Sequence, residues 1–201
     1  MTELSPLEGK IELPQAELDY WPHFLSETEA AELYTQLLLE VPWQSDRIQV
    51  FGQWYDQPRL TALYGEEGKP YTYSGITMNP HNFTRELKTL KDRIEKQTGD
   101  SFSSCLLNNY RNGSDSNGWH ADDEKELGQN PVIASLSLGH PRFFHLRPKN
   151  DKKNTYKLLL QPGSLLVMRG RTQHHWQHQL PKSKKVKEGR INLTFRQINH
   201  K

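Results

Sequence analysis

Residues 119–124, Trp-His-Ala-Asp-Asp-Glu, place two side chains that can bind a divalent metal within two positions of each other. Because side chains alternate between the two faces of an extended segment, His120 and Asp122 are expected to point the same way. One imidazole nitrogen and one carboxylate oxygen could then bind a single cation. A His-x-Asp pair alone is more often solvated than metal-bound, so the interpretation depends on a third ligand.

A histidine cluster at His174, His175 and His178 offers that third ligand. The three side chains cannot all bind one metal. His175 and His178 fall on opposite faces of an ideal strand, so the pattern leaves the choice open. Two histidines and one carboxylate on one side of a metal leave coordination positions free, and that donor set is typical of non-haem iron(II) sites at which O₂ reacts. The sequence therefore indicates an iron site.

Two arginines near the C-terminus could bind an anion beside that metal. Residues 190–196 alternate Arg, Asn, Thr and Arg with Ile, Leu and Phe, so one face of the strand is polar and the other apolar. A guanidinium matches a carboxylate with two parallel hydrogen bonds, so Arg190 and Arg196 could bind a dicarboxylate together. Their Cα atoms are about 20 Å apart along a strand, however, and an exposed, solubilising face is an equal alternative. Asn108 and Tyr110 share a face of an earlier strand and could contact the same anion or cap the sheet.

Composition restricts the class of protein. The chain has 201 residues, 26 Lys and Arg, 24 Asp and Glu, and a net charge of +2, so its overall charge does not indicate a nucleic-acid-binding protein. The single cysteine, Cys105, excludes an internal disulfide and favours a reducing compartment. Signal-peptide features are missing, and no apolar run approaches the roughly 20 residues that span a membrane. We expect a soluble intracellular monomer without membrane contact, cytoplasmic in a bacterium and nuclear in a eukaryote.

Helical signals are confined to the first half of the chain. Ser26 and Glu29 form a capping box in front of a helix predicted at 27–40. An apolar stripe predicts a second helix at about 82–98. Residues 1–15 are polar and contain two prolines, and we expect them to form a flexible tail.

Beyond residue 100, short strand patterns follow one another. They are predicted at 102–111, 132–138, 142–147, 155–160, 164–169 and 190–198, with the histidine segment between the last two. Two helices followed by about seven short strands predict an α+β, mainly β fold, in which helices support an antiparallel sandwich or jelly roll. We expect a single domain, 1–201, with helices in 16–100 and the jelly-roll core in 101–199.

The chain resembles the AlkB family of Fe(II)- and 2-oxoglutarate-dependent dioxygenases from about residue 45 to its C-terminus. The resemblance rests on His120-x-Asp122, on His178 within Trp-Gln-His-Gln-Leu-Pro, and on the Arg-x-Asn-Leu-Thr-Phe-Arg motif at 190–196, in that order. It implies a double-stranded β-helix, which is the jelly roll expected above. The implied cofactor and cosubstrates are Fe(II), 2-oxoglutarate and O₂.

The resemblance implies a role for each residue of the site. Arg190 would pair with the distal carboxylate of 2-oxoglutarate, and Arg196 would engage the end that chelates the metal. The implied iron ligands, which are also the catalytic residues, are His120, Asp122 and His178. The implied cosubstrate residues are Asn108, Tyr110, Arg190, Asn192 and Arg196.

The resemblance also implies a nucleotide-recognition lid at about 46–78. Residues 49–54 look like the hairpin with which the duplex-DNA-repair branch opens the base stack, with Phe51 as the wedge. Tyr73 and the ring of His120 would sandwich the extruded base. The remaining implied substrate contacts are Tyr71, Asp123 and Glu124. Without the resemblance, an internally packed Phe51 and two tyrosines that fill the sheet would be the simpler interpretation.

The implied activity is oxidative demethylation of N-alkylated bases in DNA, such as 1-methyladenine and 3-methylcytosine, with release of formaldehyde, succinate and CO₂. The hairpin favours double-stranded DNA. Trp119 directly before His120 looks more like the branch that prefers single strands and RNA, so the preferred strand stays open. Two alternatives to this activity remain: a related oxygenase that acts on RNA or on a protein side chain, and a non-enzymatic jelly-roll binding module.

Overall fold

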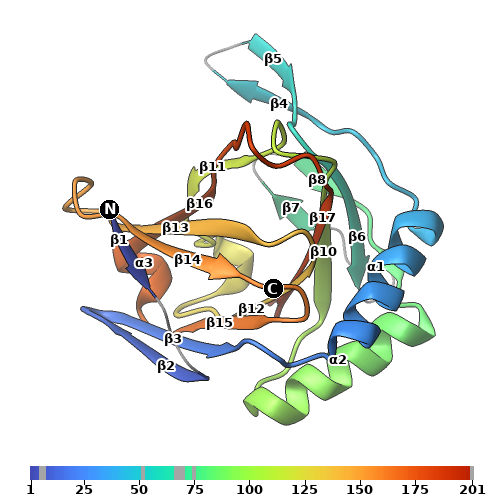
Figure 1. Cartoon of the computed structure of the whole chain (residues 1–201), viewed down its shortest axis with the longest axis horizontal. Coiled ribbons are helices and arrows are strands. Elements are labelled where there is room, and N and C mark those ends of the chain that lie inside the picture. The colour runs from blue at the N-terminus through green and yellow to red at the C-terminus, as the bar shows by residue number, and fades with distance from the viewer. Residues whose placement is uncertain (5–7, 51–52, 66–70, 74–75, 200–201) are drawn as a thin grey trace.

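Two β-sheets face each other in the computed structural model, and two helices cover the outer face of the larger sheet (Figure 1). The structure describes residues 1–4, 8–50, 53–65, 71–73 and 76–199. Most strand pairs are antiparallel; β1 with β14 and β6 with β9 are parallel. The expected mainly β fold with a jelly-roll core and supporting helices is therefore confirmed.

The larger sheet contains eight strands and the smaller sheet five. In spatial order, the larger sheet is β2 (Gly9–Leu13), β3 (Ala16–Trp21), β15 (Leu165–Arg169), β12 (Ile133–Gly139), β17 (Arg190–Arg196), β10 (Ser104–Tyr110), β6 (Leu60–Gly65) and β9 (His81–Asn82). The smaller sheet is β1 (Thr2–Leu4), β14 (Tyr156–Leu160), β13 (Arg142–Pro148), β16 (Trp176–Leu180) and β11 (Asn117–His120). Two separate hairpins are β4 (Arg47–Val50) with β5 (Gln53–Asp56) and β7 (Tyr71–Tyr73) with β8 (Ile76–Met78).

The helices begin and end for local reasons. At the start of α1 (Glu27–Glu40), Ser26 Oγ accepts from the backbone N–H of Glu29, and the Glu29 carboxylate accepts from the Ser26 N–H, so the predicted capping box is confirmed. The second long helix, α2 (Arg85–Thr98), begins later than predicted, because the two residues of β9 pair with β6 instead. The short helices are η1 (Lys125–Leu127) and α3 (Thr172–His175). No helix in the described part of the chain is both long and apolar enough to cross a membrane.

Strand β17 divides the apolar core from the polar interior. Its alternate residues Ile191, Leu193 and Phe195 are fully buried in a cluster that includes residues of α1 and α2. The residues between them face the gap between the two sheets, where they line a cavity. The predicted alternation of an apolar and a polar face is thus confirmed, and its polar face lies inside the jelly roll.

The expectation of a flexible tail at 1–15 is wrong. Thr2–Leu4 pair with β14, and Gly9–Leu13 pair with β3. Pro14 and Gln15 form the two-residue turn between β2 and β3, in which Gln15 adopts φ 59°. Pro14 therefore belongs to a tight hairpin. The core is also larger than the predicted 101–199, because β2, β3, β6 and β9 join its main sheet. In particular, Leu60–Gly65 pairs with β10 and does not belong to the lid expected at 46–78.

Candidate metal and cosubstrate site

Three metal-binding side chains converge between the two sheets. One ligand atom from each of His120, Asp122 and His178 lies within 4.8 Å of the other two. His120 and His178 stand opposite each other in the pairing of β11 with β16, and their ring centroids are 4.3 Å apart. The Asp122 carboxylate is 4.0 Å from Nε2 of His120 and 3.9 Å from Nε2 of His178. Two imidazoles and a carboxylate on one side of a common point fit an iron(II) ion.

The ring of His120 is oriented by its own strand. Its Nδ1 lies 2.7 Å from the carbonyl oxygen of Gly118. Since a carbonyl can only accept, Nδ1 carries the proton and Nε2 carries the lone pair. Nε2 is the atom that faces Asp122 and His178, so the tautomer required for metal binding is already selected.

Electrostatics keep the three ligands in their metal-binding protonation states. Burial lowers the pKa of His178 to about 3, and it also lowers the pKa of His120. Burial alone would raise the pKa of Asp122, but the charge of Arg196 and the two histidines outweigh it and bring that pKa to about 2. At neutral pH the site therefore presents two neutral imidazoles and one carboxylate.

The other two histidines of the cluster lie outside this site. His174 and His175 belong to α3, and the strand that carries His178 begins only at residue 176. His174 is exposed, and its Nε2 lies 2.9 Å from Oδ1 of Asn130. The structure thus places His178 beside His120 and Asp122, whereas His174 and His175 lie elsewhere.

The expected cosubstrate residues line one cavity with the metal-binding cluster. Its walls come from β10 and β17 of the larger sheet and from β11 and β16 of the smaller one. The predicted residues among its lining are Asn108, Tyr110, Arg190, Asn192 and Arg196. Arg190 and Arg196 are both 3 % exposed, so the alternative of a solubilising strand face is wrong.

Arg190 is a buried cation without an anionic partner among the described residues. Its Nη2 donates to Ser137 Oγ at 2.9 Å, its guanidinium lies 5.5 Å from the ring centre of Tyr110, and its buried Nε has no hydrogen-bond partner in that part of the chain. Burial lowers its pKa to about 10, which still leaves it charged at neutral pH. A buried charge is costly unless it is paired. This corner of the cavity therefore fits an anionic group such as a carboxylate.

Arg196 stands at the metal end of the same cavity. Its Nη2 donates to Oδ1 of Asp122 at 3.0 Å, and both side chains are almost completely buried. The two arginines thus occupy different ends of the cavity, which accounts for their separation along the strand. A dicarboxylate that lies along β17 would meet a guanidinium at each end.

The expected substrate residues are only partly placed. Phe51 lies outside the described residues, and Tyr71 and Tyr73 are described only through the backbone pairing of β7 with β8. Asp123 is exposed and pairs with Lys149 at 2.9 Å. Burial raises the pKa of Glu124 to about 7, with a further contribution from Asp122. Asp123 and Glu124 flank the metal-binding cluster but are not part of the cavity lining.

Several residues of the site escaped the sequence analysis. Ser135 Oγ accepts from Asn192 Nδ2 at 2.8 Å, and Ser137 serves Arg190 in the same way. Their alternation on β12 was a readable signal, because serines at every second position of an otherwise apolar strand share a face. Arg59 donates to Asn108 Oδ1 at 2.7 Å across 49 residues, and no local pattern indicated it.

Comparisons with known proteins agree with this geometry. Residues 17–196 match the family described as the 2OG-Fe(II) oxygenase superfamily. The chain is 46% identical over 187 residues to the human protein named alpha-ketoglutarate-dependent dioxygenase alkB homolog 3, covering 89% of this chain and 65% of that protein. It is 40% identical over 200 residues to the bovine DNA oxidative demethylase ALKBH2, covering 94% and 72%.

A solved structure supports the fold independently. The structure titled OsALKBH1 superposes with a TM-score of 0.65 at 18% identity, covering 94% of this chain and 99% of that one. The chain spans slightly less than two thirds of the length of human alkB homolog 3 and about 72% of bovine ALKBH2. The chain belongs to the 2OG-Fe(II) oxygenase superfamily and, within it, to the AlkB family.

Proposed function

We propose that the protein is an Fe(II)- and 2-oxoglutarate-dependent dioxygenase that oxidatively demethylates N-alkylated bases in nucleic acid, including 1-methyladenine and 3-methylcytosine in DNA. One observation carries the proposal: the His-Asp-His cluster shares a cavity with a buried arginine that has no anionic partner among the described residues. The relatives named as dioxygenases and DNA oxidative demethylases supply the substrate class.

The donor set and the cavity fit the two small-molecule partners. His120, Asp122 and His178 would hold Fe(II), while Arg190 would bind the distal carboxylate of 2-oxoglutarate. When bound, iron and 2-oxoglutarate would supply the oxidising power for hydroxylation of an N-methyl group by O₂, and the products would be succinate, CO₂ and, after loss from the base, formaldehyde. The chain itself orients these partners and excludes water with the apolar walls Leu106, Phe144 and Met168.

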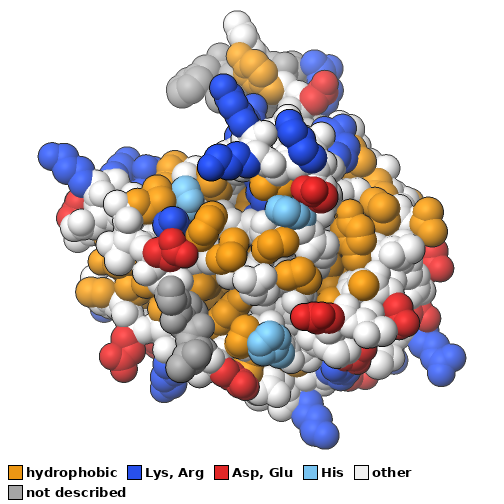
Figure 2. Space-filling view, in the orientation of Figure 1, with side chains coloured by type: hydrophobic (Ala, Val, Ile, Leu, Met, Phe, Trp, Pro, Cys, Tyr) orange, Lys and Arg blue, Asp and Glu red, His pale blue; other side chains and the backbone are white. Residues whose placement is uncertain are grey.

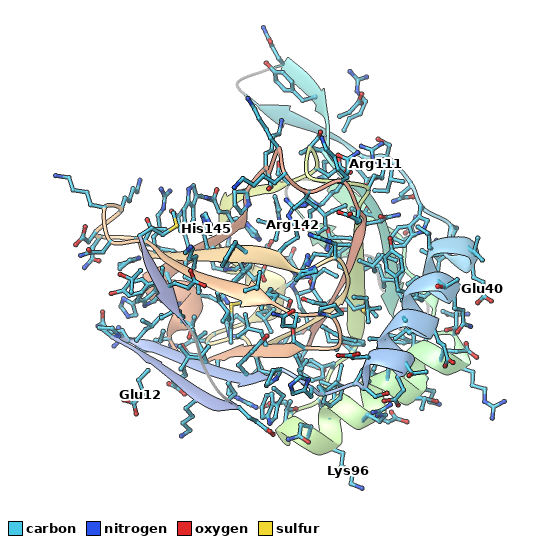
Figure 3. All side chains as sticks on the ribbon, in the orientation of Figure 1. Glu12, Glu40, Lys96, Arg111, Arg142 and His145 are labelled. Carbon is cyan, nitrogen blue, oxygen red and sulfur yellow. The ribbon has the colours of Figure 1, made fainter. Side chains whose placement is uncertain are left out.

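A basic loop between β16 and β17 supports a nucleic-acid substrate. It contains Lys182, Lys184, Lys185 and Lys187. The loop is held by two backbone hydrogen bonds to Gly113: the Ser183 N–H donates to the Gly113 carbonyl oxygen, and the Gly113 N–H donates to that of Val186. Arg142 on β13, labelled in Figure 3, also donates to the carbonyl oxygen of Pro181 at 2.6 Å. Figure 2 shows Lys and Arg side chains gathered at the end of the molecule from which the β4–β5 hairpin projects. Phosphates of a bound strand would be attracted to this end.

Release of formaldehyde from methylated oligonucleotides tests the proposal directly. The panel would contain single- and double-stranded DNA and RNA, each with one 1-methyladenine or 3-methylcytosine, in the presence of Fe(II) and 2-oxoglutarate. We expect turnover of methylated DNA and none of the unmethylated strand. Turnover of methylated RNA but not of DNA would show that the substrate is RNA. Turnover of a methylated peptide would show that the substrate is a protein side chain. If no substrate led to release of succinate, the protein would be a non-enzymatic binding module.

Substitution of Phe51 tests the preferred strand. In the duplex-repair branch, the aromatic wedge offsets an unstacking cost of a few kcal/mol that a single strand largely avoids. We therefore expect Phe51→Ala to lose roughly ten- to a hundredfold in rate on a methylated duplex, at 1.36 kcal/mol per factor of ten. The loss on the same lesion in a single strand should be much smaller. Equal losses on both substrates would contradict the role of Phe51 as a wedge. Tyr55→Ala serves as the control, because Tyr55 lies on β5 and its side chain is half exposed.

A further inference from the structure

The backbone of Asp122 lies beyond the strand that positions its partner His120. Strand β11 ends at His120, and the last pair of β11 with β16 is His120 with His178. Asp122, two residues later, has no place in this ladder, yet its backbone N–H is buried and needs a partner. A hydrogen-bond partner outside the pairing of β11 with β16 is therefore needed.

We propose that Gln173 is a positioning residue for the metal ligand Asp122. Its side chain is 1% exposed, and its Oε1 accepts a hydrogen bond from the backbone N–H of Asp122 at 2.9 Å. Arg196 binds the carboxylate of the same residue at 3.0 Å. Asp122 is thus held at both ends, by a neutral amide at the backbone and by a guanidinium at the side chain. The proposal rests on the proposed function, since it presumes that Asp122 binds the metal.

Only one orientation of the Gln173 amide fits its surroundings. Asp122 offers a donor, so the amide oxygen has to face it, and the amide nitrogen then lies 3.5 Å from the sulfur of Met168, a weak acceptor. A flipped amide would set two donors against each other. Met168 also lines the cavity, so Gln173 connects the metal ligand to the cavity wall.

The segment that carries Gln173 is braced by the N-terminal hairpin. Thr172 Oγ1 accepts from the backbone N–H of Glu17 on β3 at 2.9 Å. The indole N–H of Trp176 donates to the carbonyl oxygen of Pro14, in the turn between β2 and β3, also at 2.9 Å. Both ends of α3 are therefore tied to the hairpin. This same segment continues into β16 and His178, so one braced unit positions two of the three metal ligands.

Gln173→Met tests the role, because methionine has a similar length and shape but cannot accept the hydrogen bond. Loss of a partner that orients a metal ligand typically costs about 10–100-fold in metal affinity. We expect a weakening of that size for Mn(II), measured by calorimetry on the metal-free full chain. The melting temperature of the metal-free chain should change little, while its increase on addition of Mn(II) should shrink. Gln173→Glu, which retains an acceptor oxygen, should recover most of the affinity.

Gln177→Met is the matched control. Gln177 lies on the same segment, but its side chain is partly exposed on the outer face of the smaller sheet, where its oxygen accepts from Arg147. The Mn(II) affinity of the Gln177→Met variant should equal that of the wild type. Equal affinities for Gln173→Met and the wild type would overturn the proposal, as would a lower melting temperature with unchanged affinity. If the wild type itself binds no metal, the proposed function fails instead.

Hydrogen exchange on the wild-type chain gives a second measurement that does not depend on the folding of a variant. The Asp122 amide hydrogen, which Gln173 accepts, should exchange more slowly than the amide hydrogen of Asp123, whose residue is exposed. Equal exchange rates for these two neighbours would show that the hydrogen bond does not hold Asp122, and would overturn the inference.

Discussion

Alanine at His120, Asp122 or His178 is expected to abolish metal binding and turnover while the chain stays folded. Each side chain supplies one of three ligand atoms within 4.8 Å of one another, so no remaining pair can hold the ion in place. The loss should exceed the roughly 10–100-fold that removal of an outer partner of a metal ligand costs. The core should persist, because its two apolar clusters consist of other residues. Metal titration, formaldehyde release and circular dichroism measure these three quantities.

His174→Ala provides the control for this series. Its side chain is exposed and lies beside Asn130, away from the cluster. Metal affinity and turnover should therefore stay close to those of the wild type. If His175→Ala abolished metal binding and His178→Ala did not, the third ligand would have to be reassigned.

Arg190→Met should raise the Michaelis constant for 2-oxoglutarate by roughly thirtyfold to a few thousandfold. Removing one partner of a buried, hydrogen-bonded charge pair costs about 2–5 kcal/mol, and each 1.4 kcal/mol corresponds to a factor of ten in affinity. Arg190→Lys keeps the charge but loses the planar fork, so its effect should be smaller. The affinity for nucleic acid should change little. Steady-state kinetics with varied 2-oxoglutarate, together with strand-binding titrations, test both expectations.

The same substitution should not destabilise the cosubstrate-free protein. Arg190 is buried and meets no carboxylate within the described ranges, so an apolar side chain of similar length removes an unpaired charge from the interior. We expect an equal or higher melting temperature for Arg190→Met without 2-oxoglutarate, and a smaller increase on its addition. Arg147→Met is the control, since that arginine stacks at 4.0 Å on the ring of Trp119 on the outer face of the sheet. An unchanged Michaelis constant for Arg190→Met would remove Arg190 from the site.

Local patterns in the sequence determined the elements and the chemistry of the site. The capping box in front of α1, the alternation along β17 and the His-x-Asp spacing depend on residues at most a few positions apart, and the structure confirms each of them. The family motifs added the order of the ligands along the chain. These features were predictable because the periods of helix and strand fix which neighbouring side chains share a face.

Pairing between distant segments was decided only by the tertiary structure. The register of β11 with β16 selects His178 over His175, and the brace around Gln173 joins residues up to 162 positions apart. The strands at the N-terminus were mistaken for a flexible tail because short polar strands look like loops until a partner edge is known. Leu60–Gly65 was assigned to the lid for the same reason, since its place in the main sheet depends on β10. Local periodicity shows which face of a strand is buried, but the partner that buries it depends on contacts between distant parts of the chain.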